Sequence, residues 1–308
     1  MKQQALELDL GVRRTRKQVF LAEMDAVVPW PEMVALIEAC VPTKTNGRPR
    51  FAHEAVLRIH LLQQWYSLSE VAMEEALLDT PLFRDFAGLG GMHAQPDRVT
   101  ILRFRRVLED HKLAERFFEI VNAELLARGC MMREGTAVDA TIIHAPSSTK
   151  NRDGKRDPDM HSTKKGNQWY FRLKAHIGTD AGSGLVHTLV TTPANAADVT
   201  QAAGLLHGDG HEVYGDSGYR GIQKREEARD LQVGWQIAMT PGRRRVLDRS
   251  TESGRLTGEL ETVKARIRSK VEHAFRVLKC QFGHRKARYR GLAKNTQQLY
   301  TLFALGNL

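Results

Sequence analysis

Hydrophobic and polar positions divide the chain into two parts with different periodicities. From residue 17 to about residue 128, apolar residues recur every three or four positions, which is typical of amphipathic helices. The stretch 53–66, with Val56, Ile59 and Leu62 on one face, predicts one such helix. The first part of the chain is therefore expected to be all-helical.

Two further helix starts are marked by polar residues. Ser67 with Glu70 fits a capping box, in which two side chains satisfy the free amides at a helix start. Pro96 and Asp97 fit the start of another helix, DRVTILRFRRVLED.

The helix that begins at Asp97 combines apolar and cationic positions. Val99, Leu102 and Val107 are expected to face a core. The rest of the surface carries four arginines: Arg98, Arg103, Arg105 and Arg106. A solvated arginine face and a DNA-contacting face are both compatible with this pattern. Several short helices with a basic later helix also fit a helix-turn-helix, a motif that sequence specifies weakly.

After Gly129 the pattern changes to that of strands. Residues 136–143 are rich in β-branched side chains, and residues 170–178 alternate between apolar and polar positions, as in a half-buried strand. Residues 181–184, AGSG, predict a tight turn that completes a hairpin.

Further along, helices and strands alternate. The expected elements are helices at 198–207, 223–230 and 259–282, with strands at 211–216 and 233–239. The polar, basic stretches 147–168 and 240–258 are expected to be surface loops. This half is therefore mixed α/β.

Composition narrows the functional classes. The 308 residues are 42% hydrophobic and 27% charged, which suits a soluble globular protein of one or two domains. No apolar run approaches the roughly 20 residues of a membrane span, and no signal-peptide core is present at the N-terminus, so we expect a cytoplasmic protein. Three dispersed cysteines predict neither disulfides nor a zinc site. The net charge of +10 is compatible with a polyanionic partner such as nucleic acid.

Three carboxylates lie at positions where the surrounding sequence makes a functional role worth considering. Asp139 interrupts an apolar strand, where a lone charge is costly unless it is paired or binds a metal. Asp216 follows a second strand, directly before Ser217 and Gly218. Glu272 lies on the last long helix, beside an apolar stripe that runs from Leu260 and Val263 to Phe282.

Two cations accompany the third carboxylate. Arg268, Glu272 and Lys279 fall within roughly 40° of one another around the helix axis. A surface Arg268–Glu272 ion pair of little consequence is the simplest explanation of this helix by itself. Combined with Asp139 and Asp216, however, the set suits hard divalent cations such as Mg²⁺ or Mn²⁺ and phosphoryl transfer with two metal ions.

Several ordered motifs resemble the DDE transposases of bacterial insertion sequences, in the group named after insertion sequence 5. The resemblance covers nearly the whole chain and is carried by these stretches: FLAEMDAVVPWPEMVALIEACVP, LRIHLLQQWYSLSEVAMEEALL, GTAVDATIIHAPSSTKN, GNQWYFRLKAHIGTDAGSGLVHTLVTTPAN, GDSGY and RSKVEHAFRVLKCQFGHRKARYRGLAKN.

The resemblance implies an RNase H-like catalytic domain over residues 129–308, preceded by a helical DNA-end-binding domain over residues 1–128. It implies that Asp139, Asp216 and Glu272 are catalytic and bind two Mg²⁺ or Mn²⁺ ions. The family signature, Tyr-x2-Arg-x3-Glu-x6-Lys, is matched by Arg268, Glu272 and Lys279, but Ala265 occupies the tyrosine position.

The resemblance further implies binding to the terminal inverted repeats and to target DNA, and assembly of a homodimer or higher multimer near the bacterial nucleoid. We expect DNA contacts from eight cations: Arg98, Arg103, Arg106, Lys164, Lys165, Arg268, Lys279 and Arg288. For Trp169 and Tyr170, beside Lys164, we expect core packing rather than base stacking.

The predicted function is therefore an active transposase that cleaves DNA and transfers strands. A transposase-derived DNA-binding protein without activity is the alternative, and a plain metal-dependent nuclease of the same fold is a third hypothesis.

Overall fold

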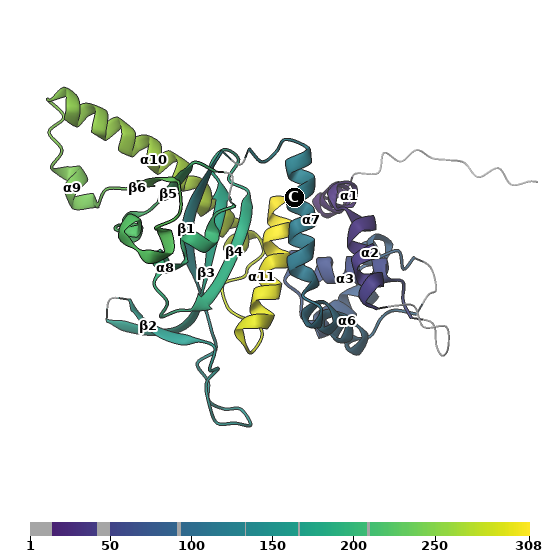
Figure 1. Cartoon of the computed structure of the whole chain (residues 1–308). Coiled ribbons are helices and arrows are strands. Elements are labelled where there is room, and N and C mark those ends of the chain that lie inside the picture. The colour runs from purple at the N-terminus through teal and green to yellow at the C-terminus, as the bar shows by residue number, and fades with distance from the viewer. Residues whose placement is uncertain (1–13, 42–49, 91–93, 133, 166, 208–209) are drawn as a thin grey trace, which may run out of the picture.

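The computed structural model describes residues 14–41, 50–90, 94–132, 134–165, 167–207 and 210–308. A helical region and a sheet region lie on opposite sides of a central pair of helices (Figure 1). The helices of the first part are α1 (Arg16–Val27), α2 (Trp30–Cys40), α3 (His53–Tyr66), α4 (Glu70–Asp79), α5 (Pro81–Phe86), α6 (Arg98–Asp110) and α7 (Leu113–Ala127).

The second part is built on one mixed sheet. Its strands are β1 (Gly135–His144), β2 (His161–Lys165), β3 (Gln168–Asp180), β4 (Val186–Pro193), β5 (Glu212–Gly215) and β6 (Gly234–Ile237). They are ordered β2-β3-β1-β5-β6, and β4 pairs with β3. Strand β1 is antiparallel to β3 but parallel to β5, and β5 is parallel to β6.

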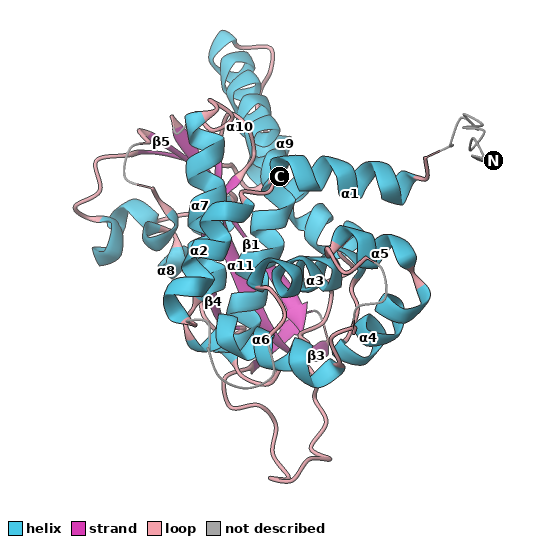
Figure 2. Ribbon diagram, turned by 90° about the vertical axis from the view of Figure 1, so that its right-hand side faces the viewer, coloured by secondary structure: helices cyan, strands magenta, loops and turns pink. Residues whose placement is uncertain are grey.

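Two long helices, α10 (Glu252–Arg276) and α11 (Leu292–Asn307), pack against this sheet (Figure 2), and α10 continues into a π-helical turn at Val277–Gln281. The other helices of this part are the short α8 (Asp198–Gln201) and α9 (Pro241–Arg245). Short 3₁₀ turns occupy Ala203–Leu205, Ser217–Tyr219, Ile222–Lys224 and Glu226–Ala228. The predicted mixed α/β fold with a helical N-terminal part is confirmed.

The C-terminal helix α11 joins the two parts. It packs against α7 on one side and against β4 on the other, and it buries Leu299, Leu302 and Phe303. One hydrophobic core therefore runs from the helical region into the sheet. The expected domain boundary at residues 128 and 129 falls between α7 and β1, and the division into two domains stays a prediction.

One predicted helix cap is confirmed and one is wrong. Asp97 caps α6, and its carboxylate accepts a hydrogen bond from the Thr100 amide at 2.8 Å. Ser67, in contrast, ends α3 in a left-handed conformation with a φ of 58°. Ser69 caps α4 in its place, because its hydroxyl accepts from the Ala72 amide.

The expected buried face of α6 is only partly correct. Ile101, Phe104 and Leu108 are buried, Val107 packs against the core while partly buried, and Val99 is exposed. The choice between two overlapping apolar stripes depends on where α3 and α7 pack, and helical spacing alone does not contain that information.

Strand β3 is buried on both faces along most of its length, so the expected half-buried strand is wrong. Leu173 and Ile177 pack into the main core, while His176 on the opposite face is fully buried. The turn at Ala203–Leu205 covers this second face together with α8.

Three expected helices differ from the observed ones. The stretch 198–207 contains only α8 and a 3₁₀ turn, because Leu206 is extended. The stretch 223–230 contains two 3₁₀ turns, because Arg225 between them is extended. The last helix begins earlier, at Glu252, inside an expected loop, and β2 likewise lies inside the other expected loop.

Only half of the apolar stripe on α10 is buried. Val271 and, in the π turn, Leu278 lie in the core, but Leu260 and Val263 remain about half exposed. The first half of α10 projects beyond the sheet (Figure 1), and Leu260 and Val263 belong to this projecting half.

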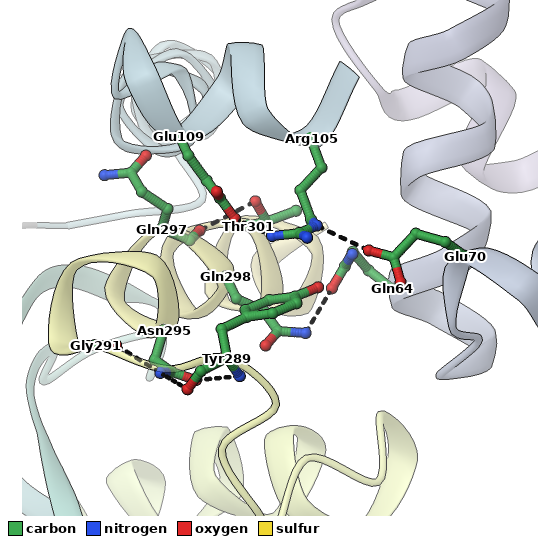
Figure 3. Close-up of polar contacts among 10 residues, drawn as sticks. All are labelled: Gln64, Glu70, Arg105, Glu109, Tyr289, Gly291, Asn295, Gln297, Gln298 and Thr301. Atoms are coloured by element: carbon green, nitrogen blue, oxygen red, sulfur yellow. Dashed lines mark hydrogen bonds and ion pairs between the residues drawn. The ribbon is translucent and has the colours of Figure 1, made fainter. Parts of the chain in front are cut away.

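A buried polar cluster also connects the two parts (Figure 3). Arg105 forms ion pairs with Glu109 on its own helix and with Glu70 on α4, at 2.9 Å. Its guanidinium lies 4.2 Å from the ring centroid of Tyr289, which precedes α11. Arg105 is thus not part of a DNA-facing surface but binds helical and C-terminal segments together.

Replacement of Arg105 by alanine should destabilise the protein by about 2 kcal/mol or more, because two partly buried glutamates lose their partner. The exposed neighbour Arg103 provides the control, and its replacement by alanine should change stability by less than about 0.5 kcal/mol. Urea denaturation followed by circular dichroism measures both. Equal effects for the two variants would contradict this account of the cluster.

Candidate active site

Asp139 lies where the pairing of two parallel strands ends. The last paired residues of β1 and β5 are Ala137 and Tyr214. Asp139 follows two residues after Ala137 and is half-buried. On the other side of β1, it still pairs with Ile177 of β3. The carboxylate is therefore held by β1 at a point where the neighbouring strand has stopped.

Asp216 directly follows β5. Continuing the β1–β5 register by two residues places it opposite Asp139. Its carboxylate accepts a hydrogen bond from the Gly218 amide at 2.7 Å and so caps the turn Ser217–Tyr219. A Cβ atom on Gly218 would lie 2.8 Å from that carboxylate oxygen, so glycine permits the close approach.

The two carboxylates influence each other. The pKa of Asp139 is raised to about 6, chiefly by burial, although the Ala140 amide, which donates to this carboxylate at 2.7 Å, lowers the pKa. The charge of Asp216 contributes to the increase, and that of Arg268 opposes it. Two acids and one arginine from three separate elements therefore lie within electrostatic reach of one another.

Sequence reasoning missed two further groups at this site. Tyr219 is buried, and its hydroxyl has no hydrogen-bond partner among the described residues. Burial and the charges of Asp139, Asp198 and Asp216 raise the pKa of this phenol. Its place in GDSGY, three residues after Asp216, was the available signal.

Asp198 is the second missed group. It lies at the start of α8, and the Lys174 ammonium donates to it at 2.9 Å. Its charge also raises the pKa of Asp139. Nothing in its local sequence distinguished it from a surface acid.

Helix α10 carries Arg268 and Glu272, which sequence reasoning grouped with Asp139 and Asp216. The Lys270 ammonium anchors it by donating to the carbonyl of Ala181 at 2.7 Å, and the buried Glu261 accepts from the Met239 amide. Arg268 is thereby brought near Asp139, while Glu272, one turn further, has an exposed side chain.

Within the described ranges, no three His, Cys, Asp or Glu side chains lie close enough together to hold a metal ion. The structure thus brings Asp139 and Asp216 together with Arg268. Glu272 lies on the adjoining helix, and its membership of the site stays a prediction.

The predicted DNA-contacting cations lie in different places. Arg98, Arg103 and Arg106 are exposed on α6. Lys164 and Lys165 lie on β2, paired with Trp169 and Gln168.

Two of the predicted cations have other neighbours. Lys279 lies in the π turn, near His144 rather than Asp139. Arg288 donates to the carbonyl and the hydroxyl of Ser67, which ties the segment before α11 to the α3–α4 turn.

The expected core packing of Trp169 is wrong, because 69% of this residue is exposed. It lies on β3 and pairs with Lys164 of the edge strand β2.

Comparison with known families decides the class of protein. Residues 131–308 match the family described as "Transposase DDE domain", and residues 9–107 match the family described as "Transposase domain (DUF772)". The first match covers more than half of the chain. The chain belongs to the DDE transposases. No solved structure matches it.

Membership confirms the predicted family, and the observed sheet is consistent with the RNase H-like fold of DDE transposases. Assignment to the insertion sequence 5 group stays a prediction. DNA is the partner that a transposase implies. No helix in the described part of the chain combines the length and apolar surface that a bilayer crossing requires.

DDE transposases use divalent metal ions, and the residues at this site fit such an ion. Asp139 and Asp216 present oxygen donors, the kind that Mg²⁺ and Mn²⁺ prefer. The raised pKa of Asp139 shows that ionisation of this carboxyl is costly without a counter-charge. A divalent cation between the two carboxylates would remove that cost.

Replacement of Asp139 by asparagine should stabilise the metal-free protein at pH 7. In the wild-type protein the carboxyl pKa is about 6, above its ordinary value of 3.8, so ionisation above pH 6 disfavours the folded state. The asparagine variant avoids this penalty of about 3 kcal/mol at most and keeps an oxygen that accepts from the Ala140 amide.

The gain in stability of the asparagine variant over wild type should shrink as the pH falls through 6. It should vanish below about pH 4, where the carboxyl is neutral in both the folded and the unfolded state. Thermal melts in chelator across this range measure it. A variant that is less stable than wild type at pH 7, or whose effect does not change with pH, would contradict the assignment.

Proposed function

We propose that this transposase binds the terminal inverted repeats of an insertion sequence, cleaves DNA strands at the repeat ends and transfers them into target DNA. The observation that supports this most strongly is the pair of carboxylates, Asp139 and Asp216, just beyond the point where the parallel pairing of β1 with β5 ends.

Each residue of the proposed site has a role that follows from its chemistry. Asp139 and Asp216, with Glu272 from α10, would hold two Mg²⁺ or Mn²⁺ ions. These ions, when bound, activate the attacking water or 3′-hydroxyl and stabilise the leaving oxygen. Arg268 balances the charge of the carboxylates and contacts the DNA backbone.

DNA binding is proposed to involve both parts of the molecule. The exposed α6 arginines Arg98, Arg103 and Arg106 serve end recognition, and Lys164 and Lys165 on β2 add backbone contacts. Lys279 adds a contact at the far end of β1. A homodimer or higher multimer would bring two ends together.

Arg288 already donates to Ser67, so we do not propose it as a principal DNA contact. Its proposed role is to hold the segment before α11 against the helical region.

A catalytically inactive DNA-binding protein is the second candidate, and one observation favours it. Glu272 is exposed and is not gathered with Asp139 and Asp216 into a three-residue group. The same experiment separates the two candidates, since it measures binding and cleavage independently.

Replacement of Glu272 by glutamine should abolish cleavage, with a loss of at least about a hundredfold, because one carboxylate ligand is removed. DNA affinity should change by less than about threefold. Labelled duplexes carrying the repeats that flank the gene, incubated with Mg²⁺ and run on denaturing gels, measure cleavage, while native gels measure binding.

The matched control is Glu259→Gln, which removes an exposed carboxylate from the same helix, paired only with Arg255 among the described residues. It should cleave like wild type. Binding without cleavage by wild type and both variants would favour the inactive protein, whereas cleavage without joining to target DNA would favour a plain nuclease.

A further inference from the structure

A row of basic side chains crosses the sheet at the end of β1 that lies away from Asp139. His161 on β2 pairs with Arg172 on β3, and Arg172 pairs with His144 on β1. His144 in turn forms a bridge with Lys286, from the segment before α11. Directly paired residues of neighbouring strands point to the same face of a sheet, so these four residues form one basic row.

Arg172 is the unusual member of this row. It is only 4% exposed, yet no acidic side chain in the described ranges pairs with it, and its Nε atom has no hydrogen-bond partner. Other shielded cations of the protein are paired: Arg105 with Glu70 and Glu109, and Lys174 with Asp198. A covered guanidinium without an anion is costly, so an anionic partner is missing.

The surroundings of Arg172 leave its hydrogen-bonding edge available. The guanidinium stacks on the ring of Tyr170, with 3.6 Å between its central carbon and the ring centroid. Stacking occupies a face of the planar group but not the N–H donors at its edge. The Tyr170 ring is itself held by His144, at 5.8 Å between ring centroids in an edge-on arrangement.

Other cations increase the positive potential here. Partial burial lowers the pKa of His144, and the charges of Arg172, Lys279 and Lys286 lower it further. Positive groups from β1, β3, the π turn and the segment before α11 therefore converge on one place. Repulsion among them adds to the cost of leaving the site without an anion.

We propose that the basic row, centred on Arg172, binds a phosphate group, and that this phosphate belongs to the DNA backbone. A planar guanidinium edge matches two phosphate oxygens, and flanking lysines and histidines complete the neutralisation. The assignment of DNA as the source rests on the proposed function. The phosphate site itself rests on the unpaired Arg172.

The position of the row sets its relation to the cleavage site. His144 lies five residues beyond Asp139 on β1, roughly 16 Å at the rise of an extended strand. Because this spacing is odd, the two side chains point to opposite faces of β1, so the row lies on the other face of the sheet from Asp139. The contacted phosphate is therefore expected at least about 16 Å from the position that is cut.

The test compares wild type with Arg172→Met and with a matched control, Arg156→Met. Arg156 is exposed and lies over the neighbouring Phe171 ring, at 5.6 Å, outside the basic row. Binding to duplexes that carry the flanking repeats is measured in chelator, so that catalysis plays no part. A single neutral methylphosphonate replaces each backbone phosphate in turn.

Wild type and Arg156→Met should both lose affinity when one particular backbone phosphate is neutralised. Arg172→Met should bind about tenfold more weakly at low salt, be insensitive to that same replacement, and show a salt slope smaller by about one. Equal sensitivity of Arg172→Met and wild type at every phosphate would overturn the DNA assignment.

Thermal melts test the phosphate site independently of DNA. Without ligand, Arg172→Met should melt at a higher temperature than wild type, because an unpaired covered charge is replaced by an apolar side chain of similar length. Inorganic phosphate should raise the melting temperature of wild type and of Arg156→Met, relative to sodium chloride of equal ionic strength, but not that of Arg172→Met.

A lower melting temperature for Arg172→Met, together with equal stabilisation of both proteins by inorganic phosphate, would show that Arg172 is purely structural and would overturn the site. Stabilisation that depends on Arg172, without binding of wild type to repeat DNA, would assign the site to free phosphate and contradict the proposed function instead.

Discussion

The parallel pairing of β1 with β5 is the constraint on which the rest of the site depends. It brings two residues that are 77 positions apart in the chain to neighbouring strands. The paired residues end at Ala137 and Tyr214, and continuing the same register places Asp139 and Asp216 opposite each other. Burial and the charge of Asp216 raise the pKa of Asp139, so its ionised form is unfavourable without a counter-charge. Binding of a cation would relieve this electrostatic penalty.

Helices that pack against the sheet hold this arrangement in place. Lys270 and Glu261 fix α10 against the sheet by bonds to backbone atoms, which sets the position of Arg268 beside Asp139. Helix α11 packs between α7 and β4, so the helical part that carries the α6 arginines is held to the sheet by a shared core. The proposed end-recognition surface and the proposed active site would thereby be rigidly connected.

Much of the fold and the centre of the site could be predicted from the sequence. Asp139 and Asp216 stood out because local pattern alone placed them within and after strands. The buried face of α6 and the exposure of Leu260 and Val263 on α10 could not be predicted, since they depend on which distant segments pack there. Asp198 was missed for the same reason: it lies on α8, and its partner Lys174 lies on β3.

The net charge of +10 correctly indicated a polyanionic partner. The positions of individual cations, in contrast, were a poor guide to which residues contact DNA. Arg105 and Arg288 look like DNA-binding residues in the sequence, but both bind other residues of the protein: Arg105 pairs with Glu70, and the exposed Arg288 donates to Ser67. Arg172 looked like an ordinary polar position of a strand and is instead a covered cation without an acidic partner among the described residues. What separates these arginines is the presence of a carboxylate or carbonyl from a distant segment.

The central claim is that Asp139 and Asp216 form one metal-binding centre, and crystallography with Mn²⁺ tests it most directly. Anomalous difference maps from crystals containing Mn²⁺ should show a peak within coordination distance of both carboxylates. Mn²⁺ bound elsewhere on the protein, with no peak between Asp139 and Asp216, would contradict the account.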